Sequence, residues 1–148
     1  MKYLIFGLSI IAFTLGSCSQ DQFELDQELI EEYIADNNLT AEKDPSGVYV
    51  IITEEGTGDE HPDINSTVEV RYTGYLLDGS IFDSSGEETI VFALSGLITG
   101  WQIGIPYLKK GGKQTLLIPS SLGYGGNAVG SIPANSVLIF DIELVDFN

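Results

Sequence analysis

The chain has 148 residues, which is enough for one domain and too few for two of ordinary size. It carries 22 acidic and six basic side chains, and the resulting formal net charge of −16 disfavours binding to nucleic acid or to an anionic lipid surface. A single cysteine excludes an internal disulfide and, with only one histidine, cannot form a Cys/His zinc site, so we expect neither a metal nor a cofactor.

The first 17 residues have the pattern of a bacterial signal peptide. Met1 and Lys2 form a short positive start, and the apolar run that follows, 3–13, is too short to span a bilayer as a stable helix. Leu15-Gly16-Ser17-Cys18 resembles the lipobox of bacterial lipoproteins, which implies cleavage before Cys18 and a lipid anchor on it, outside the cytoplasm. The alternative is an ordinary secretory signal in which Cys18 is a free thiol.

Residues 18–45 are acidic and are predicted to form a linker that contains a helix. Asp26 is a candidate cap for a helix that runs to about Asn38. Two interpretations are open: a linker that holds the domain away from the membrane, or an apolar stripe that packs on the domain or on a second copy. The first is favoured because short isolated helices are marginally stable. The apolar residues recur mostly at spacings of three and four: Phe23, Leu25, Leu29, Ile30, Tyr33 and Ile34.

Residues 46–148 are predicted to form an α+β domain, a five-stranded antiparallel sheet curled around one short helix. A strong hairpin signal, Asp78-Gly79, follows an alternating strand, and a 15-residue glycine-rich loop runs from Pro119 to Pro133. The helix falls between residues 95 and 106, where glycines and Pro106 limit its length. Strand patterns occur at 48–53, 67–77, 81–82, 90–94, 113–118 and 137–145.

One long stretch of the domain has no acidic residue. Between Thr89 and Phe140 the only charged side chains are lysines, and the stretch is rich in glycine, isoleucine, leucine and aromatic residues. Such a composition favours an apolar pocket over acid–base hydrolysis, which needs well-placed carboxylates.

Four blocks of this domain, in order, resemble the signature of FKBP-type peptidyl-prolyl isomerases. They are Val70-Arg71-Tyr72-Thr73-Gly74-Tyr75-Leu76-Leu77-Asp78-Gly79-Ser80-Ile81-Phe82-Asp83-Ser84-Ser85, Leu97-Ile98-Thr99-Gly100-Trp101, the segment from Ile118-Pro119 through Gly123-Tyr124-Gly125, and Ile132-Pro133 through Leu144. The resemblance covers about Val48 to Val145. It implies the same antiparallel sheet wrapped around a short helix.

The resemblance also implies a ligand pocket and its parts. Trp101 forms the floor, and the catalytic groups are Asp83, the backbone N–H of Ile98 and the Tyr124 hydroxyl. The substrate-binding residues are Tyr72, Phe82, Leu97, Trp101, Ile132 and Phe140. Singly, most of these are as well explained as ordinary core residues, and only the ordered set indicates a site.

The function implied is cis/trans isomerisation of prolyl bonds in folding extracytoplasmic proteins, whose proline-containing segments would be the partners. The alternative is a non-catalytic chaperone or adaptor with the same pocket. Macrolide inhibitors are possible ligands, although the chain departs from the best-known members at two places. Ile90 stands where they carry an aromatic residue, and Ala128-Val129 stands where many carry a flap histidine.

Overall fold

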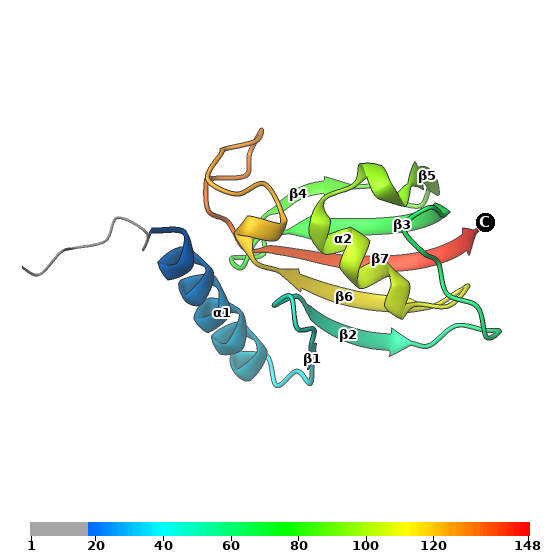
Figure 1. The fold of residues 1–148 in the computed structure, drawn as a ribbon, viewed down its shortest axis with the longest axis horizontal. Coiled ribbons are helices and arrows are strands. Elements are labelled where there is room, and N and C mark those ends of the chain that lie inside the picture. The colour runs from blue at the N-terminus through cyan, green and yellow to red at the C-terminus, as the bar shows by residue number, and fades with distance from the viewer. Residues whose placement is uncertain (1–17) are drawn as a thin grey trace, which may run out of the picture.

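The computed structural model describes residues 18–148, and the predicted signal peptide, residues 1–17, lies outside them (Figure 1). In chain order the elements are α1 (Cys18–Asp36), β1 (Glu42–Lys43), β2 (Tyr49–Glu54), β3 (Thr67–Tyr75), β4 (Ile81–Ser84), β5 (Ile90–Ala93), α2 (Thr99–Gly104), β6 (Lys113–Ile118) and β7 (Leu138–Phe147). Short 3-10 helices occupy Leu94–Gly96, Ile105–Tyr107 and Ser120–Leu122. None of the helices in this part of the chain combines the length and the apolar character needed to cross a membrane.

All strand pairs are antiparallel, in the order β1-β2-β6-β7-β3-β4, with β5 also paired to β3. The predicted α+β architecture is confirmed, but the described sheet has seven strands and not five. The short β1 adds an edge strand. The other additional strand arises because β3 is long enough to pair with two strands in succession, with β5 through Thr67–Val70 and with β4 through Thr73–Tyr75. The Asp78-Gly79 hairpin forms as predicted, with Gly79 at φ 83°.

Helix α2 crosses the inner face of the sheet, as Figure 1 shows. Two glycines allow this close approach, because a Cβ at Gly100 would meet the side chain of Ile118 and one at Gly104 would lie 2.5 Å from Leu116 Cδ1. Pro106 follows in a 3-10 turn, so the α-helix ends at Gly104, as its sequence predicts. The main core lies between α2 and the sheet.

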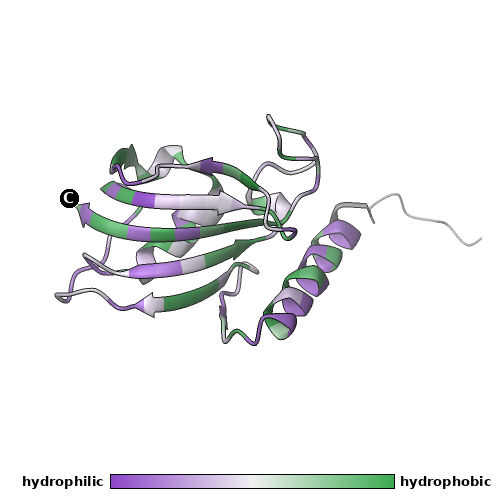
Figure 2. Ribbon diagram, turned by 180° about the vertical axis from the view of Figure 1, so that it is seen from behind, coloured by the Kyte–Doolittle hydropathy of each residue, from purple (hydrophilic) through white to green (hydrophobic). Residues whose placement is uncertain are grey.

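A second hydrophobic cluster lies on the outer face. Neighbouring residues of β7 belong to different clusters, Ile139 to the outer one and Phe140 to the inner one, because successive side chains of a strand point to opposite faces. Ile30 of α1 is fully buried in the outer cluster. Figure 2, which views this face, shows hydrophobic strand ends beside α1.

Helix α1 therefore packs on the domain, as the second of the two interpretations of this segment expected. That the segment also holds the domain away from a membrane stays a prediction. The helix begins at Cys18, and Asp26 is a buried residue of its interior, not its cap. Its C-terminus closes as a Schellman motif, in which Leu39 N–H donates to Ile34 O (2.9 Å) and Asn38 adopts φ 52°. The periodicity identified the helix, but not the partner that its buried face requires.

Candidate active site

A cavity of about 210 Å³ opens between α2, the inner face of the sheet and the loop that follows β6. Eight residues line it: Tyr72, Asp83, Phe92, Leu97, Ile98, Trp101, Tyr124 and Phe140. They come from β3, β4, β5, β7, the start of α2 and the glycine-rich loop, so the cavity depends on the whole domain. Seven of the eight are residues that the sequence analysis assigned to a site.

The floor and walls are aromatic rings that contact one another. The Trp101 ring lies 5.2 Å from both the Tyr72 and the Phe140 ring, centroid to centroid, at interplanar angles of 85° and 89°. The Phe92 ring lies 6.3 Å from the Trp101 ring at 89°. Such edge-to-face contacts stabilise each pair by roughly 0.5–1.5 kcal/mol beyond the burial of their area. The rings thus hold each other in place around the cavity.

Two predicted binding residues do not line the cavity, and one lining residue was missed. The half-buried Phe82 ring lies 5.4 Å from the Phe140 ring, and Ile132 is buried in the main core. Phe92 supplies the aromatic group whose absence at Ile90 seemed a departure. The alternation of β5 could have identified it, because residues 90 and 92 share one face of a strand.

Gly74 of β3 explains where the Phe82 and Phe140 rings lie. A Cβ there would stand 2.6 Å from Phe82 Cε2 and 2.7 Å from Phe140 Cε1, so the two rings cover the space left by the missing side chain. The glycine of the Tyr72-Thr73-Gly74 block is therefore needed for the packing of the wall.

The polar groups of the cavity lie at its edge. The Tyr72 hydroxyl donates to Asp83 Oδ2 (2.8 Å), and the Ser84 N–H donates to Asp83 Oδ1 (2.9 Å), so both carboxylate oxygens are engaged. Burial, reinforced by the hydrogen bond and the negative charge of Asp83, raises the pKa of Tyr72 to about 12. Tyr72 therefore remains a hydrogen-bond donor throughout the neutral pH range.

Three further donors of the cavity are unpaired within residues 18–148. The Tyr124 hydroxyl and the Ile98 backbone N–H donate to no group there, and the buried Trp101 Nε1 also has no partner. The Tyr124 side chain is partly exposed, and Ile98 is the N-cap of α2. The cavity thus offers unpaired hydrogen-bond donors, and both oxygens of its one carboxylate, Asp83, are already bound by Tyr72 and Ser84.

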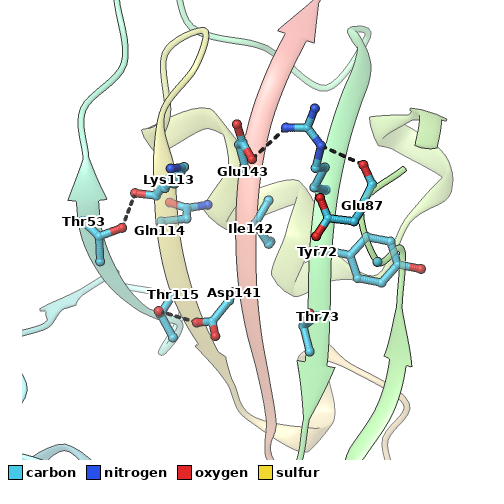
Figure 3. Close-up of a pocket in the computed structure, with 12 residues that line it drawn as sticks. Thr53, Tyr72, Thr73, Glu87, Lys113, Gln114, Thr115, Asp141, Ile142 and Glu143 are labelled. Carbon is cyan, nitrogen blue, oxygen red and sulfur yellow. Dashed lines mark hydrogen bonds and ion pairs between the residues drawn. The ribbon is translucent and has the colours of Figure 1, made fainter. Parts of the chain in front are cut away.

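A larger depression, of about 540 Å³, lies on the outer face of the sheet (Figure 3). Its two cationic side chains form ion pairs: Arg71 Nη1 with Glu143 Oε2 at 2.9 Å, and Lys113 Nζ with Glu54 Oε1 at 2.9 Å. Thr115 donates to Asp141 at 2.6 Å. Residues 18–148 contain no group of three or more His, Cys, Asp or Glu side chains arranged to hold a metal ion. The aromatic cavity is the better candidate site.

The fold and the cavity agree with what the comparisons with known proteins show. Residues 58–145, more than half of the chain, match the family model described as FKBP-type peptidyl-prolyl cis-trans isomerase. The chain belongs to this family.

Similar relatives include proteins described as FKBP-type peptidyl-prolyl cis-trans isomerase FkpA. The one from Escherichia coli K12 is 46% identical over 103 residues, 68% of this chain and 38% of the relative. The one from Buchnera aphidicola of Schizaphis graminum is 49% identical over 106 residues, 70% of this chain and 42% of the relative. The chain thus spans less than half the length of these relatives.

Solved structures show the same fold. The crystal structure of FkpA from Escherichia coli superimposes with a TM-score of 0.76 at 38% identity, covering 88% of this chain and 61% of that chain. A peptidyl-prolyl cis-trans isomerase from Pseudomonas syringae gives a TM-score of 0.75 at 30% identity, covering 91% of this chain and 99% of that chain.

Proposed function

We propose that the protein is a peptidyl-prolyl cis/trans isomerase that acts on proline-containing segments of folding proteins outside the cytoplasm. The observation that carries the proposal is the cavity of about 210 Å³ walled by Tyr72, Phe92, Trp101 and Phe140. Ligand pockets for drug-sized molecules usually have about 300–1,000 Å³. The smaller, aromatic volume suits a single proline ring.

The chemistry follows from amide resonance. The planar X–Pro bond carries negative charge on its oxygen, and rotation out of the plane removes that charge separation. An apolar cavity solvates the planar form poorly and loses less by holding the twisted form, so it binds the transition state better than the ground state. Uncatalysed isomerisation takes about 10–100 s, and an acceleration of about a thousandfold requires only about 4 kcal/mol.

Hydrogen-bond donors at the edge would hold the peptide during rotation. The Ile98 N–H is free to bind the carbonyl that precedes proline, and the Tyr124 hydroxyl is free to bind a neighbouring carbonyl. Asp83 would orient the Tyr72 hydroxyl, from which it accepts a hydrogen bond of 2.8 Å. The proposed reaction needs no covalent intermediate.

The proposal extends to where the protein works. The Leu15-to-Cys18 pattern supports removal of a signal peptide and a lipid anchor on Cys18, which would place the domain at a membrane outside the cytoplasm. Mass spectrometry of the membrane fraction would test this, with the unmodified Cys18→Ser protein as control. Recovery of an unacylated, freely soluble protein would contradict the anchor.

A proline tetrapeptide assay on the purified protein tests the activity. We expect acceleration by the wild type and a reduction of kcat/KM by about tenfold in Tyr124→Phe, the equivalent of one lost hydrogen bond at about 1.4 kcal/mol. Val91→Ala serves as control, because Val91 is exposed on β5 and does not line the cavity. No acceleration over background at micromolar protein would overturn the proposal.

Two additions to this assay separate the remaining candidates. Tacrolimus should inhibit if the cavity accepts macrolides in spite of Ile90 and Ala128-Val129. If Tyr124→Phe abolishes isomerisation but leaves suppression of aggregation unchanged, the protein also has the chaperone or adaptor function, independent of catalysis.

A further inference from the structure

A buried carboxyl group connects helix α1 to the loop that carries Tyr124. Asp26, in the middle of α1, is completely buried. Its Oδ2 accepts hydrogen bonds from both the backbone N–H of Ser120 (2.8 Å) and the Ser120 hydroxyl (2.6 Å), and its Oδ1 accepts one from Gln22 (2.7 Å). A buried carboxyl without partners is strongly unfavourable, so these bonds fix α1 and Ser120 relative to each other.

Ser120 in turn binds the N–H groups of both glycines that flank Tyr124. Its carbonyl oxygen accepts from the N–H of Gly123 (3.0 Å) and from the N–H of Gly125 (2.8 Å). On the other side, the Gly125 carbonyl accepts from the Asn135 N–H (2.8 Å). The segment is therefore a compact turn organised around one buried serine, which is only 1% exposed.

The sequence of this turn explains why it needs an anchor. Gly123 and Gly125 flank Tyr124 directly, and Gly125 has φ 62°, a conformation that glycine adopts without strain. The same freedom makes an unanchored glycine-rich segment flexible. The Tyr124 side chain, which is 37% exposed, has little packing of its own to hold it over the cavity.

We propose that Asp26 is a positioning residue of the isomerase site, which acts through Ser120 to fix the backbone that carries the Tyr124 hydroxyl. Helix α1 is thereby a functional part of the domain as well as a segment that precedes it. The kinetic consequence rests on the function proposed above, whereas the structural coupling does not. Misplacement of a substrate-binding group by about 1 Å can cost up to about a hundredfold in rate.

Helix α1 has a second attachment that provides a matched control. Gln27 Nε2 donates to Gly47 O (2.9 Å), and the Tyr49 hydroxyl lies within hydrogen-bond distance of two acceptors, Gln27 Oε1 (3.0 Å) and Glu31 Oε1 (2.6 Å). These bonds join α1 to β2 and the residues before it, and none involves the Tyr124 turn. Tyr49→Phe thus weakens the attachment of the helix without removing a bond to Ser120.

The first experiment measures amide hydrogen exchange by NMR in the full chain, independently of activity. In Asp26→Asn we expect the Gly123 and Gly125 amides to exchange at least about tenfold faster relative to the amides of β7, because the turn opens locally. In Tyr49→Phe the exchange rates of the Gly123 and Gly125 amides, relative to those of the β7 amides, should equal the wild-type values. The proposal would be overturned if these relative exchange rates were the same in both variants, or if those of Asp26→Asn equalled the wild-type values.

The second experiment is a double-mutant cycle on kcat/KM. If Asp26 acts through Tyr124, Asp26→Asn lowers kcat/KM by about threefold to tenfold in the wild-type background and by less than about twofold in Tyr124→Phe. Independent, additive losses would contradict the proposal. Ser120→Ala, which removes only the hydroxyl bond, replaces Asp26→Asn in both experiments if that variant does not fold. A wild type without isomerase activity would refute the proposed function, while the exchange ratios would still decide whether Asp26 orders the turn.

Discussion

At the scale of single residues, the aromatic side chains that line the cavity pack against one another. Tyr72 contacts three other rings, with centroid distances of 5.2 Å to Trp101, 6.3 Å to Phe92 and 6.4 Å to Phe140. Its hydroxyl group is bound to Asp83. A wall of this kind is organised before a ligand arrives, which reduces the entropy that binding has to overcome.

Phe92 provides a direct test of the cavity at this scale. Phe92→Ala should raise the Kd for a proline peptide or an inhibitor by about tenfold, because one aromatic wall worth about 1–2 kcal/mol is lost. Val91→Ala, the next residue on β5, is the matched control, since Val91 is 61% exposed and does not line the cavity. Calorimetric titration measures both, and an equal effect of the two substitutions would show that Phe92 does not contact the ligand.

Tyr72 leads to a prediction about alkaline pH. Its folded-state pKa of about 12 lies above the value of about 10 expected in the unfolded chain. The neutral phenol is therefore favoured in the folded state, and its contribution to stability is complete below about pH 10 and disappears as the pH rises to about 12. Over this interval the free energy of unfolding should decline less in Tyr72→Phe than in the wild type.

Urea unfolding at several pH values across that interval would measure the difference. Burial likewise raises the pKa of Tyr75, and a hydrogen bond to Asp44 raises that of Tyr107 to about 12, so these residues should leave a decline in the variant as well. Parallel curves for variant and wild type would contradict the assignment to Tyr72.

Most of the site could be predicted from the sequence because its residues lie in contiguous motif blocks. Phe92 lies outside those blocks, and only the alternation along β5, in which residues 90 and 92 share one face, points to it. Phe82 and Ile132 lie within them, yet neither lines the cavity: the Phe82 ring packs on that of Phe140, and Ile132 is part of the core. A motif places a residue near a site, but the packing of neighbouring rings decides which residue is exposed to the ligand.

At the scale of elements, the position of the cavity depends on how closely α2 approaches β6. Gln114 of β6 donates from Nε2 to Gly104 O at 2.9 Å, and the glycines of α2 face the side chains of β6 without an intervening Cβ. This close approach places Trp101, which lies between the two glycines, at the floor of the cavity.

Gly100→Ala tests this arrangement. The new methyl group would overlap three side-chain atoms of the fully buried Ile118, and we expect a loss of about 1–3 kcal/mol in the free energy of unfolding, as for overpacked cores. Gly96→Ala is the matched control, because a Cβ there meets nothing within 4 Å. Denaturant unfolding of the two variants would measure the difference, and similar stabilities would show that α2 can move away from β6 at little cost.

The docking of α1 on the domain is the element-level feature that the sequence left open between two interpretations. A pattern of apolar residues identifies a helix, but its buried face also carries Asp26 and Gln27, which resemble capping or surface residues in sequence. Their partners, Ser120 and Gly47, are 94 and 20 residues away. A buried polar contact between such distant positions has no local signature.

At the scale of the whole molecule, negative charge is only partly compensated. Four of the basic side chains in the described chain form ion pairs: Lys43 with Glu31, Arg71 with Glu143, Lys110 with Asp146, and Lys113 with Glu54. All four pairs are substantially exposed, and such pairs contribute about 0–1 kcal/mol each. Repulsion among the remaining carboxylates opposes the compact state.

Added salt should therefore stabilise the protein. With a net charge of −16, we expect the Tm to rise by a few degrees between about 20 mM and about 300 mM NaCl, because screening relieves more repulsion than it weakens attraction. Differential scanning fluorimetry would measure it, with sodium sulfate at equal ionic strength separating screening from ion-specific effects. A Tm that falls with salt would mean that the ion pairs dominate.

The alternation of clusters along β7 has a consequence for engineering. Phe140 forms a wall of the cavity, and Ile139, one peptide bond earlier, lies in the outer cluster beneath α1. A redesign that shifts β7 to admit a bulkier ligand would also move Ile139, and with it the surface on which α1 packs. A change in the shape of the cavity and a replacement of the N-terminal helix therefore affect each other. In a chimera that joins this domain to a foreign helix, the packing of that helix on β7 would limit which ligands fit the cavity.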